Sequence, residues 1–275
     1  MYSQPVPSTP WLSLVIPAWN EERLLPALLD TVDAARRAVP GGDAIEVIVA
    51  DNASTDGTAA LAAARGCRVV PVAKRVIGAV RNGGASAASG EILAFIDADS
   101  RIHPQSFAVI RNTLASPSVI GGATGVVFDR WSAGIAATWA LGATLAWLTG
   151  LDAGVVFCRR ADFASAGGYS EDRLFAEDVE FLLDLKRLGR MRGQRLVRPR
   201  GAKAITSTRK FDRHGDWHGL HLTARTIAAS LISPLLGRAT RRDVVRDVAR
   251  RYWYEDRVSR PSPPADALPS PPRAE

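Results

Sequence analysis

Cysteine is scarce in this 275-residue chain: Cys67 and Cys158 are its only two, and their spacing matches no metal-binding or redox motif. A chain of this length buries enough surface to fold without disulfides, so we expect a reducing compartment. The opening residues MYSQPVPSTP lack a basic start followed by an apolar stretch, so we expect no secretory signal. With 47% hydrophobic and 23% charged residues, the composition excludes collagen, a coiled coil, a disulfide scaffold and wholesale disorder.

Two common phosphate-binding motifs are also missing. None of the 23 glycines is followed two residues later by another glycine, which removes the dinucleotide fingerprint. The chain also lacks the Gly-x4-Gly-Lys-Ser/Thr loop. The sequence therefore gives no support to NAD-type or P-loop nucleotide binding.

Charge is distributed unevenly along the chain. Residues 1–186 carry 15 Lys and Arg against 20 Asp and Glu, whereas residues 187–275 carry 20 against 8. A basic half indicates a surface that faces anions, such as lipid headgroups or a phosphorylated substrate. The acidic half argues against a nucleic-acid binder, so we expect lipid or phosphate and no nucleic acid.

Strand and helix patterns alternate through roughly the first 115 residues. The expected strands are 12–16, 45–50, 67–72 and 92–96. Helices are expected after Asn20, which offers an N-cap, and then up to Gly66, over 78–89 and from Pro104 to about Leu114. This alternation predicts an α/β fold with a mostly parallel central sheet flanked by helices.

Polar clusters follow three of these strands, at Pro17–Glu22, Asp51–Asp56 and Asp97–Asp99. Ligands of parallel sheets bind outside the carboxyl ends of the strands, so these clusters indicate a ligand site. Asp97 and Asp99 can present hard oxygen ligands to one side, which suits Mg2+ bridging to a phosphate. A solvated loop is the alternative interpretation of an isolated Asp-x-Asp.

Four blocks, in order, carry a family resemblance: LVIPAWNEE at 14–22, VIVADNASTDGT at 47–58, RNGGASAASGEILAFIDADS at 81–100 and FAEDVEFLLDLKRLG at 175–189. Together they resemble the family 2 glycosyltransferases of GT-A fold over about 190 residues. The resemblance implies a nucleotide-diphosphate sugar donor, a divalent cation, Mg2+ or Mn2+, and an inverting transfer.

The resemblance also implies the site residues. The nucleotide-sugar-binding positions are Pro17, Ala18, Asn20, Glu21, Asp51, Arg75, Arg81, Asn82, Asp97 and Ala98. Asp51 matches the acid that recognises the nucleobase, Asp99 matches the direct metal ligand, and Asp97 matches a ligand nearer the ribose. Arg75 and Arg81 flank a position for a basic group near the diphosphate. Glu177-Asp178 matches the catalytic pair, with Asp178 as general base; capping of a helix that begins near Val179 is the alternative.

The chain departs from the processive members of the family, because their Gln-x-x-Arg-Trp block is absent. We therefore expect one transfer rather than a polymer. The segment from Thr206 resembles small bacterial members, in which Arg209 or His214 would close over the diphosphate and Trp217 would stack on a sugar. A basic loop on solvent is the alternative.

Residues 131–151 contain no charge, but a membrane crossing here would place Asp99 and Asp178 on opposite sides of the bilayer. We expect a buried or interfacial helix instead, which contacts an apolar acceptor or a membrane surface or belongs to the core. A second apolar segment, 220–237, precedes a basic helix at 237–258. Its arginines and aromatics suit an anionic membrane or a solvated helix. The Pro-rich residues 259–275 and the first ten residues should not contribute to a core.

These observations predict a GT-A glycosyltransferase domain over 11–236, with a donor half at 11–100 and an acceptor half at 101–236, followed by a helical C-terminal segment. The predicted protein is cytoplasmic, with peripheral contact at the inner membrane face left open, and its acceptor is unknown, with lipid-linked or apolar acceptors among the options. The alternative functions are a non-catalytic nucleotide-sugar-binding or membrane-surface scaffold on the same fold, and a nucleotidyltransferase.

Overall fold

The computed structural model describes residues 9–172 and 177–221. Within these ranges, residues up to Val127 and Ala143–Ser207 form one compact unit, while Phe128–Gly142 and the residues from Thr208 onward belong to a second. The expected flexible start, the basic helix at 237–258 and the Pro-rich tail lie wholly or almost wholly outside the described residues, as does most of the segment 220–237. The division into donor and acceptor halves at residue 100 stays a prediction.

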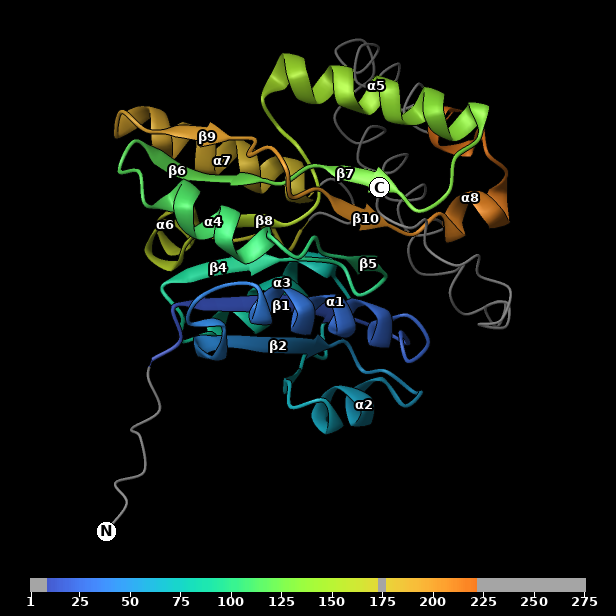
Figure 1. Ribbon diagram of the computed structural model, residues 1–275, viewed down its shortest axis with the longest axis horizontal. Coiled ribbons are helices and arrows are strands. Elements are labelled where there is room, and N and C mark those ends of the chain that lie inside the picture. Colours follow the sequence, from blue (N-terminus) through green and yellow to red (C-terminus); the bar gives the residue numbers. More distant parts are fainter. Residues whose placement is uncertain (1–8, 173–176, 222–275) are drawn as a thin grey trace. The chain divides into compact units, whose positions relative to one another are not determined.

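The first unit is organised around a seven-stranded sheet of order β3-β2-β1-β4-β8-β6-β9 (Figure 1). Its strands are β1 (Leu12–Ala18), β2 (Ile45–Asp51), β3 (Arg68–Pro71), β4 (Ile92–Phe95), β6 (Val119–Ala123), β8 (Val156–Arg159) and β9 (Arg195–Val197). All neighbours are parallel except β8, which runs antiparallel to both β4 and β6. The predicted α/β fold with a mostly parallel sheet is therefore confirmed.

Helices cover both faces of this sheet (Figure 1). In chain order they are α1 (Leu25–Arg37), the short 3-10 turn η1 (Gly42–Ala44), α2 (Thr58–Ala64), α3 (Ile77–Ser86), α4 (Ser106–Leu114), α6 (Arg160–Ala166) and α7 (Glu177–Met191). The apolar side chains of α1 and α4 pack on one face in one buried cluster. Those of α3 and α7 pack on the other face in a second cluster. This three-layer arrangement, with a sheet between two layers of helices, is what an alternating α/β sequence predicts.

The carboxyl ends of β1 and β2 lie in register. Ala18 is the Cα partner of Asp51, and the next residue, Asn52, donates its amide hydrogen to the carbonyl of Ala18 at 2.8 Å. The polar segments that follow these strands therefore leave the sheet side by side. This register is what brings two of the three predicted polar clusters together.

A second, three-stranded sheet has the order β5-β10-β7, formed by β5 (Ser100–Arg101), β10 (Ala204–Thr206) and β7 (Val126–Phe128). Pairing of β5 with β10 is antiparallel. The hydroxyls of Ser100 and Thr206 lie 3.0 Å apart across this pair. The segment that follows Asp97 and Asp99 is thereby fixed to a strand about 100 residues further along the chain.

Two short pieces of chain make up the described part of the second unit. The first half of α5 (Ala133–Thr149) belongs to it, together with α8 (Arg209–His214). Arg130 forms ion pairs with Asp212 and Asp216, each at 2.7 Å, which tie the two pieces together. Aromatic rings of Phe128, Trp131, Trp139 and Phe211 pack edge to face beside these pairs.

The predicted uncharged helix is present as α5, but it is not a core helix. Only Gly134, Ile135 and Ala146 are buried along it. The side chains of Trp147 and Leu148 are largely exposed. Within the part of the chain that the structure describes, no helix is both long enough and apolar enough to cross a bilayer.

The expected N-cap at Asn20 is wrong. Helix α1 begins at Leu25, with Leu24 at the N-cap and Pro26 in its first turn. Asn20 instead has a left-handed backbone, with φ of 54°, and its side chain binds the neighbouring loop. The local sequence is compatible with Asn20 either as an N-cap or as a left-handed loop residue. The contact with Thr55, distant in sequence, favours the loop conformation.

Candidate active site

Two loops that follow β1 and β2 are joined by a network of hydrogen bonds. The Asn20 side-chain oxygen accepts from the Thr55 amide at 2.8 Å, and the Asn20 amide donates to the Ser54 hydroxyl at 3.0 Å. The amide of Glu21 donates to the Thr58 hydroxyl at 2.8 Å. Pro17 and Ala18 lie buried at the end of β1 just before this network. The predicted first turn and the loop after Asp51 are therefore held together by these hydrogen bonds.

Asp51 is the last residue of β2, directly before the second of these loops, and it is only 8% exposed. Its Oδ2 accepts a hydrogen bond from the Ser54 amide at 3.3 Å. Its buried Oδ1 has no hydrogen-bond partner among the described residues. Burying a carboxylate oxygen without a donor is costly, so this atom points to a ligand that supplies one.

The contacts of Arg75 and Asn82 are separate from the hydrogen bonds around Asp51. The guanidinium of Arg75 lies over the ring of buried Trp19, 5.0 Å from its centroid, next to the first turn. Asn82 binds the backbone of Tyr169 through both ends of its amide, at 2.9 Å each, and donates to Glu171 at 3.0 Å. In this structure Asn82 holds the segment around Tyr169 in place.

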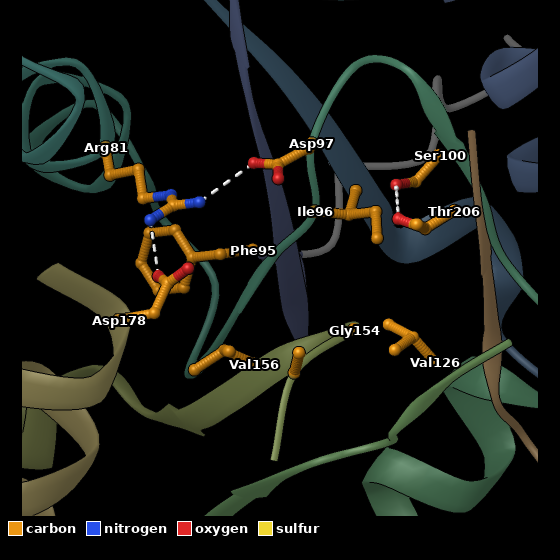
Figure 2. Close-up of a pocket in the computed structure, with 11 residues that line it drawn as sticks. Arg81, Phe95, Ile96, Asp97, Ser100, Val126, Gly154, Val156, Asp178 and Thr206 are labelled. Atoms are coloured by element: carbon orange, nitrogen blue, oxygen red, sulfur yellow. Dashed lines mark hydrogen bonds and ion pairs between the residues drawn. The ribbon is translucent and has the colours of Figure 1, made fainter. Parts of the chain in front are cut away.

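Arg81 joins the predicted donor and acceptor residues. Its side chain is 5% exposed, and its guanidinium binds the carboxylate of Asp97 at 2.8 Å and also that of Asp178 (Figure 2). It binds the carboxylate of Glu177 as well, at 2.7 Å. The side chain comes from α3 and reaches between the end of β4 and the start of α7. The carboxylates that the sequence placed 80 residues apart thus share one cation.

Close packing of α3 against the sheet positions Arg81. A Cβ on Gly84 would lie 2.4 Å from Val15 on β1, so a larger residue would push α3 away. The Tyr169 ring lies below the guanidinium, 5.1 Å from it, which adds a cation–π contact. Arg81 is therefore held through its two terminal nitrogens and its ring contact, while its Nε has no hydrogen-bond partner among the described residues.

Electrostatics within this cluster are unbalanced, because three carboxylates surround one guanidinium. Burial of the Asp178 carboxyl raises its pKa to about 7; Arg81 opposes this shift, and the negative charges of Glu177 and Asp97 add to it. Asp178 nevertheless keeps 39% of its side chain exposed, so a substrate can reach it. A reachable carboxylate with a pKa near neutrality is suited to proton transfer.

Asp97, Ala98 and Asp99 form a tight turn after β4, closed by a hydrogen bond of 3.0 Å from the Ser100 amide to the Asp97 carbonyl. Among the described residues, no three His, Cys, Asp or Glu side chains form a group that could hold a metal ion alone. The donor set is two carboxylates on one turn, and Mg2+ or Mn2+ is usually held by such a pair when phosphates supply further oxygens. These residues fit a divalent cation that arrives with a diphosphate.

A small pocket opens between these elements (Figure 2). Its polar lining residues are Arg81, Asp97, Ser100, Asp178 and Thr206. Apolar side chains of Phe95, Ile96, Val126 and Val156 complete the lining, with Ala153 and Gly154. Asp97 from the turn after β4 and Asp178 from α7 therefore face one cavity.

The three remaining predicted residues belong to the second unit. Arg209 opens α8 and His214 closes it, and the His214 ring stacks on His218 with centroids 4.6 Å apart. Trp217 is half exposed just after this helix. Their predicted approach to the diphosphate or the sugar stays a prediction.

Sequence reasoning missed Tyr169, Glu171 and Trp19. Tyr169 supports Arg81, Glu171 binds both Lys74 and Asn82, and Trp19 supports Arg75. One signal was available for Tyr169, the Gly167-Gly168 pair before it. In the structure Gly168 has φ of 70°, and a Cβ there would lie 2.9 Å from the Asn82 oxygen. No local pattern marks the other two.

The sheet order, the carboxylates at the strand ends and the helix that carries Asp178 together define a GT-A glycosyltransferase fold. The family model described as "Glycosyl transferase family 2" matches residues 13–160, more than half of the chain. The chain therefore belongs to glycosyltransferase family 2. An uncharacterized glycosyltransferase of Mycobacterium bovis, and likewise one of Mycobacterium tuberculosis, is 40% identical over 88 residues, which is 32% of this chain and 36% of the relative. The match thus spans about a third of the length of these curated relatives.

Solved structures with the same fold include several nucleotide complexes. Glucosyl-3-phosphoglycerate synthase from Mycobacterium tuberculosis, in complex with Mn2+, UDP and glucosyl-3-phosphoglycerate, is 25% identical with a TM-score of 0.53, covering 82% of this chain and 80% of that one. The mannosyltransferase PcManGT from Pyrobaculum calidifontis, with GDP-Man and Mn2+, is 18% identical with a TM-score of 0.55, covering 93% and 84%. S. aureus TarS 1-349 with UDP-GlcNAc is 17% identical with a TM-score of 0.55, covering 90% and 74%. The last two likenesses concern the fold.

Proposed function

We propose that this protein transfers one sugar from a nucleotide-diphosphate sugar to an acceptor hydroxyl, with inversion at the anomeric carbon and with Mg2+ or Mn2+. The observation that carries the proposal is the Arg81 cluster, in which one buried cation binds both Asp97 and Asp178. The similar solved structures hold UDP, UDP-GlcNAc or GDP-Man, two of them with Mn2+, which supports the donor class and the metal. We place the reaction in the cytoplasm, together with the supply of the nucleotide-sugar donor.

In this mechanism Asp178 takes the proton from the acceptor hydroxyl. The acceptor oxygen forms a bond to the anomeric carbon while the bond from that carbon to the diphosphate oxygen breaks on the opposite face. Asp99 and Asp97 would hold the cation, which when bound neutralises the departing diphosphate. The proton ends on Asp178, and the diphosphate leaves with the nucleotide.

Nucleobase recognition falls to Asp51 in this proposal. Its Oδ1 lacks a donor in the described structure, and a base that presents a ring N–H beside its carbonyl would supply one. Both uracil and guanine carry such an N–H. Adenine and cytosine offer only an exocyclic amino group with an acceptor ring nitrogen beside it, which faces the carboxylate unfavourably. Uridine and guanosine donors are therefore expected to bind better than adenosine and cytidine donors.

The pH dependence of transfer follows from Asp178. Only its ionised form can accept a proton, and its pKa is raised to about 7. The value of kcat/KM is therefore expected to rise as the pH increases through about 7 and to level off above it. A profile that is flat across neutral pH, while the melting temperature is constant over the same range, would contradict Asp178 as the base.

Calorimetric titration of a panel of nucleotide diphosphates and nucleotide sugars, each with Mn2+ and with EDTA, tests the donor site. For native protein we expect metal-dependent binding of one nucleotide. Asp99→Ala should weaken that binding by roughly tenfold or more in Mn2+ and leave the EDTA value unchanged. The matched control is Asp43→Ala, an exposed aspartate in η1 just before β2. An equal loss of binding for Asp99→Ala in EDTA would refute a metal role.

Turnover separates the proposal from its alternatives. Release of free nucleoside diphosphate in the presence of an acceptor identifies a transferase, and release of pyrophosphate identifies a nucleotidyltransferase. Binding of the donor without either product, across a panel of lipid-linked, apolar and small polar acceptors, would favour the non-catalytic scaffold.

A further inference from the structure

Exposed apolar side chains gather on two helices of the first unit. Seven large apolar residues are exposed among the described residues, and five of them lie on α5 and α7 within this unit: Trp147, Leu148, Val179, Leu183 and Met191. Trp147 is 76% exposed and Met191 is 78% exposed. Scattered exposed apolar residues need no explanation, but a concentration on two elements marks an interaction surface.

The exposed residues of α7 form a stripe, and a hydrogen bond links this stripe to the end of α5. On α7, Val179, Leu183, Lys186 and Arg190 follow one another at spacings of four, three and four residues, so they form one stripe along the helix. The Lys186 ammonium donates to the carbonyl of Thr149, the last residue of α5, at 2.6 Å. Thr149 therefore contacts this stripe, which is about 17 Å long from Val179 to Arg190. Trp147 and Leu148 immediately precede Thr149 on α5.

We call this set the α7 patch; its members are Trp147, Leu148, Val179, Leu183, Lys186, Arg187, Arg190 and Met191. The opposite side of α7 holds Phe181, Leu182 and Leu185 in the core, so the helix is already anchored without the patch. The apolar side chains on the exposed side are therefore not needed to anchor α7 in the fold.

Charge around the α7 patch has one predominant sign. From Val179 to Ser207 the sequence contains eight arginines and lysines and two acids, Glu180 and Asp184. Asp184 pairs with Arg187, and acids outside this range neutralise part of the remaining charge: Asp162 pairs with Arg192, and Asp152 with Arg198. Arg190, Arg195, Arg200 and Lys203 add exposed cations.

We infer that the α7 patch binds the surface of an anionic lipid bilayer. Bulky apolar side chains, including a Trp, flanked by Lys and Arg are the composition that inserts at a headgroup boundary and attracts anionic lipids. A second copy of this chain would bring like charges together, because the net charge of the protein is +7. Residues 222–275 carry ten cations against six acids, so they would also meet the patch with like charge.

The α7 patch begins one residue after the proposed base, but on another side of the helix. Asp178 faces the Arg81 cluster, on the same side of α7 as Phe181 and Leu185, whereas Val179 is exposed. A bilayer against the patch would therefore hold the protein at a membrane that carries lipid acceptors, a use that rests on the proposed function. Vesicle binding without any sugar donor tests the surface alone, so its failure is distinct from a failure of the proposed function.

Flotation of the full chain with vesicles of phosphatidylglycerol and phosphatidylcholine, and with phosphatidylcholine alone, tests the inference. Native protein should float with the anionic vesicles and remain behind with the neutral ones. Arg187→Gln/Arg190→Gln removes two cations from the patch and should lower partitioning by roughly 25-fold, about fivefold per charge. Trp147→Ser/Leu148→Ser should lower it as well, by removing the apolar contact.

Arg37→Gln/Arg160→Gln is the matched control, because it removes the same charge from exposed positions on α1 and α6. It should float almost as well as native protein, and all variants should keep the native melting temperature. The inference is overturned if native protein does not float, or if the control loses as much as the patch variant. It is also overturned if Arg250→Gln/Arg251→Gln abolishes flotation while the patch variants float normally, or if the patch variants only convert a dimer to a monomer.

Discussion

Replacing Asp178 with Asn should reduce transfer by roughly 10²- to 10⁴-fold, the contribution expected of a positioned general base. The amide keeps the shape of the side chain but cannot accept the proton. Arg81 would still bind Asp97 and Glu177, so the cluster keeps its framework. Donor binding, measured by calorimetry, is therefore expected to remain within a few fold of native.

Asp184→Asn on the same helix is the matched control for this experiment. Asp184 pairs with Arg187 at the surface, far along α7 from the cluster, and its loss should leave transfer unchanged. An Asp178→Asn variant that retains native kcat would remove Asp178 from the mechanism. Equal losses for the two variants would point to a general effect of charge on α7.

Replacing Arg81 with Met should have the largest effect on stability. Removing one partner of a buried charge cluster leaves the others uncompensated, which costs about 3–5 kcal/mol. Here the remaining groups are three carboxylates around a cavity shaped for a guanidinium. In a chain of this size the loss corresponds to a decrease in melting temperature of roughly 10 °C.

Arg65→Met provides the comparison, because Arg65 also bridges two aspartates, Asp30 and Asp33, but on the surface. Exposed ion pairs contribute about 0–1 kcal/mol, so urea unfolding should detect little change. The cost of Arg81→Met should decrease at lower pH, where the carboxylates take up protons, and Arg81→Lys should recover only part of it. Similar costs for Arg81→Met and Arg65→Met would show that the cluster does not stabilise the fold.

Most of the sheet could be predicted because its first half is local. Strands β1 to β4 alternate with helices, each announced by an apolar run and a polar or glycine boundary, and the structure keeps their order. The direction of β8 could not be predicted in this way. Its apolar run would suit either direction, and its antiparallel pairing with β4 is visible only in the structure.

The site residues likewise fall into two groups, those that the sequence identifies and those that only the structure identifies. Asp51, Asp97, Asp99 and Asp178 stand in motifs that the sequence displays, so their identity as candidates required no structure. The depth of Arg81 in the protein, and its simultaneous contact with Asp97 and Asp178, depend on how closely α3 packs on β1. Tyr169 and Glu171 are functional only through such packing, and no spacing rule reveals them.

The place of β8 in the sheet also sets an order of events during synthesis. A nascent chain can assemble β3, β2, β1 and β4 as soon as the first hundred residues leave the ribosome, because the pairings of β3 with β2, β2 with β1 and β1 with β4 need no later strand. The open edge of β4 must then wait for β8 at Val156–Arg159, and β6, although made earlier, has its sheet partners only in β8 and β9. An unpaired strand edge is a site of aggregation, so a pause in translation between β4 and β8 would expose this protein when it is most vulnerable.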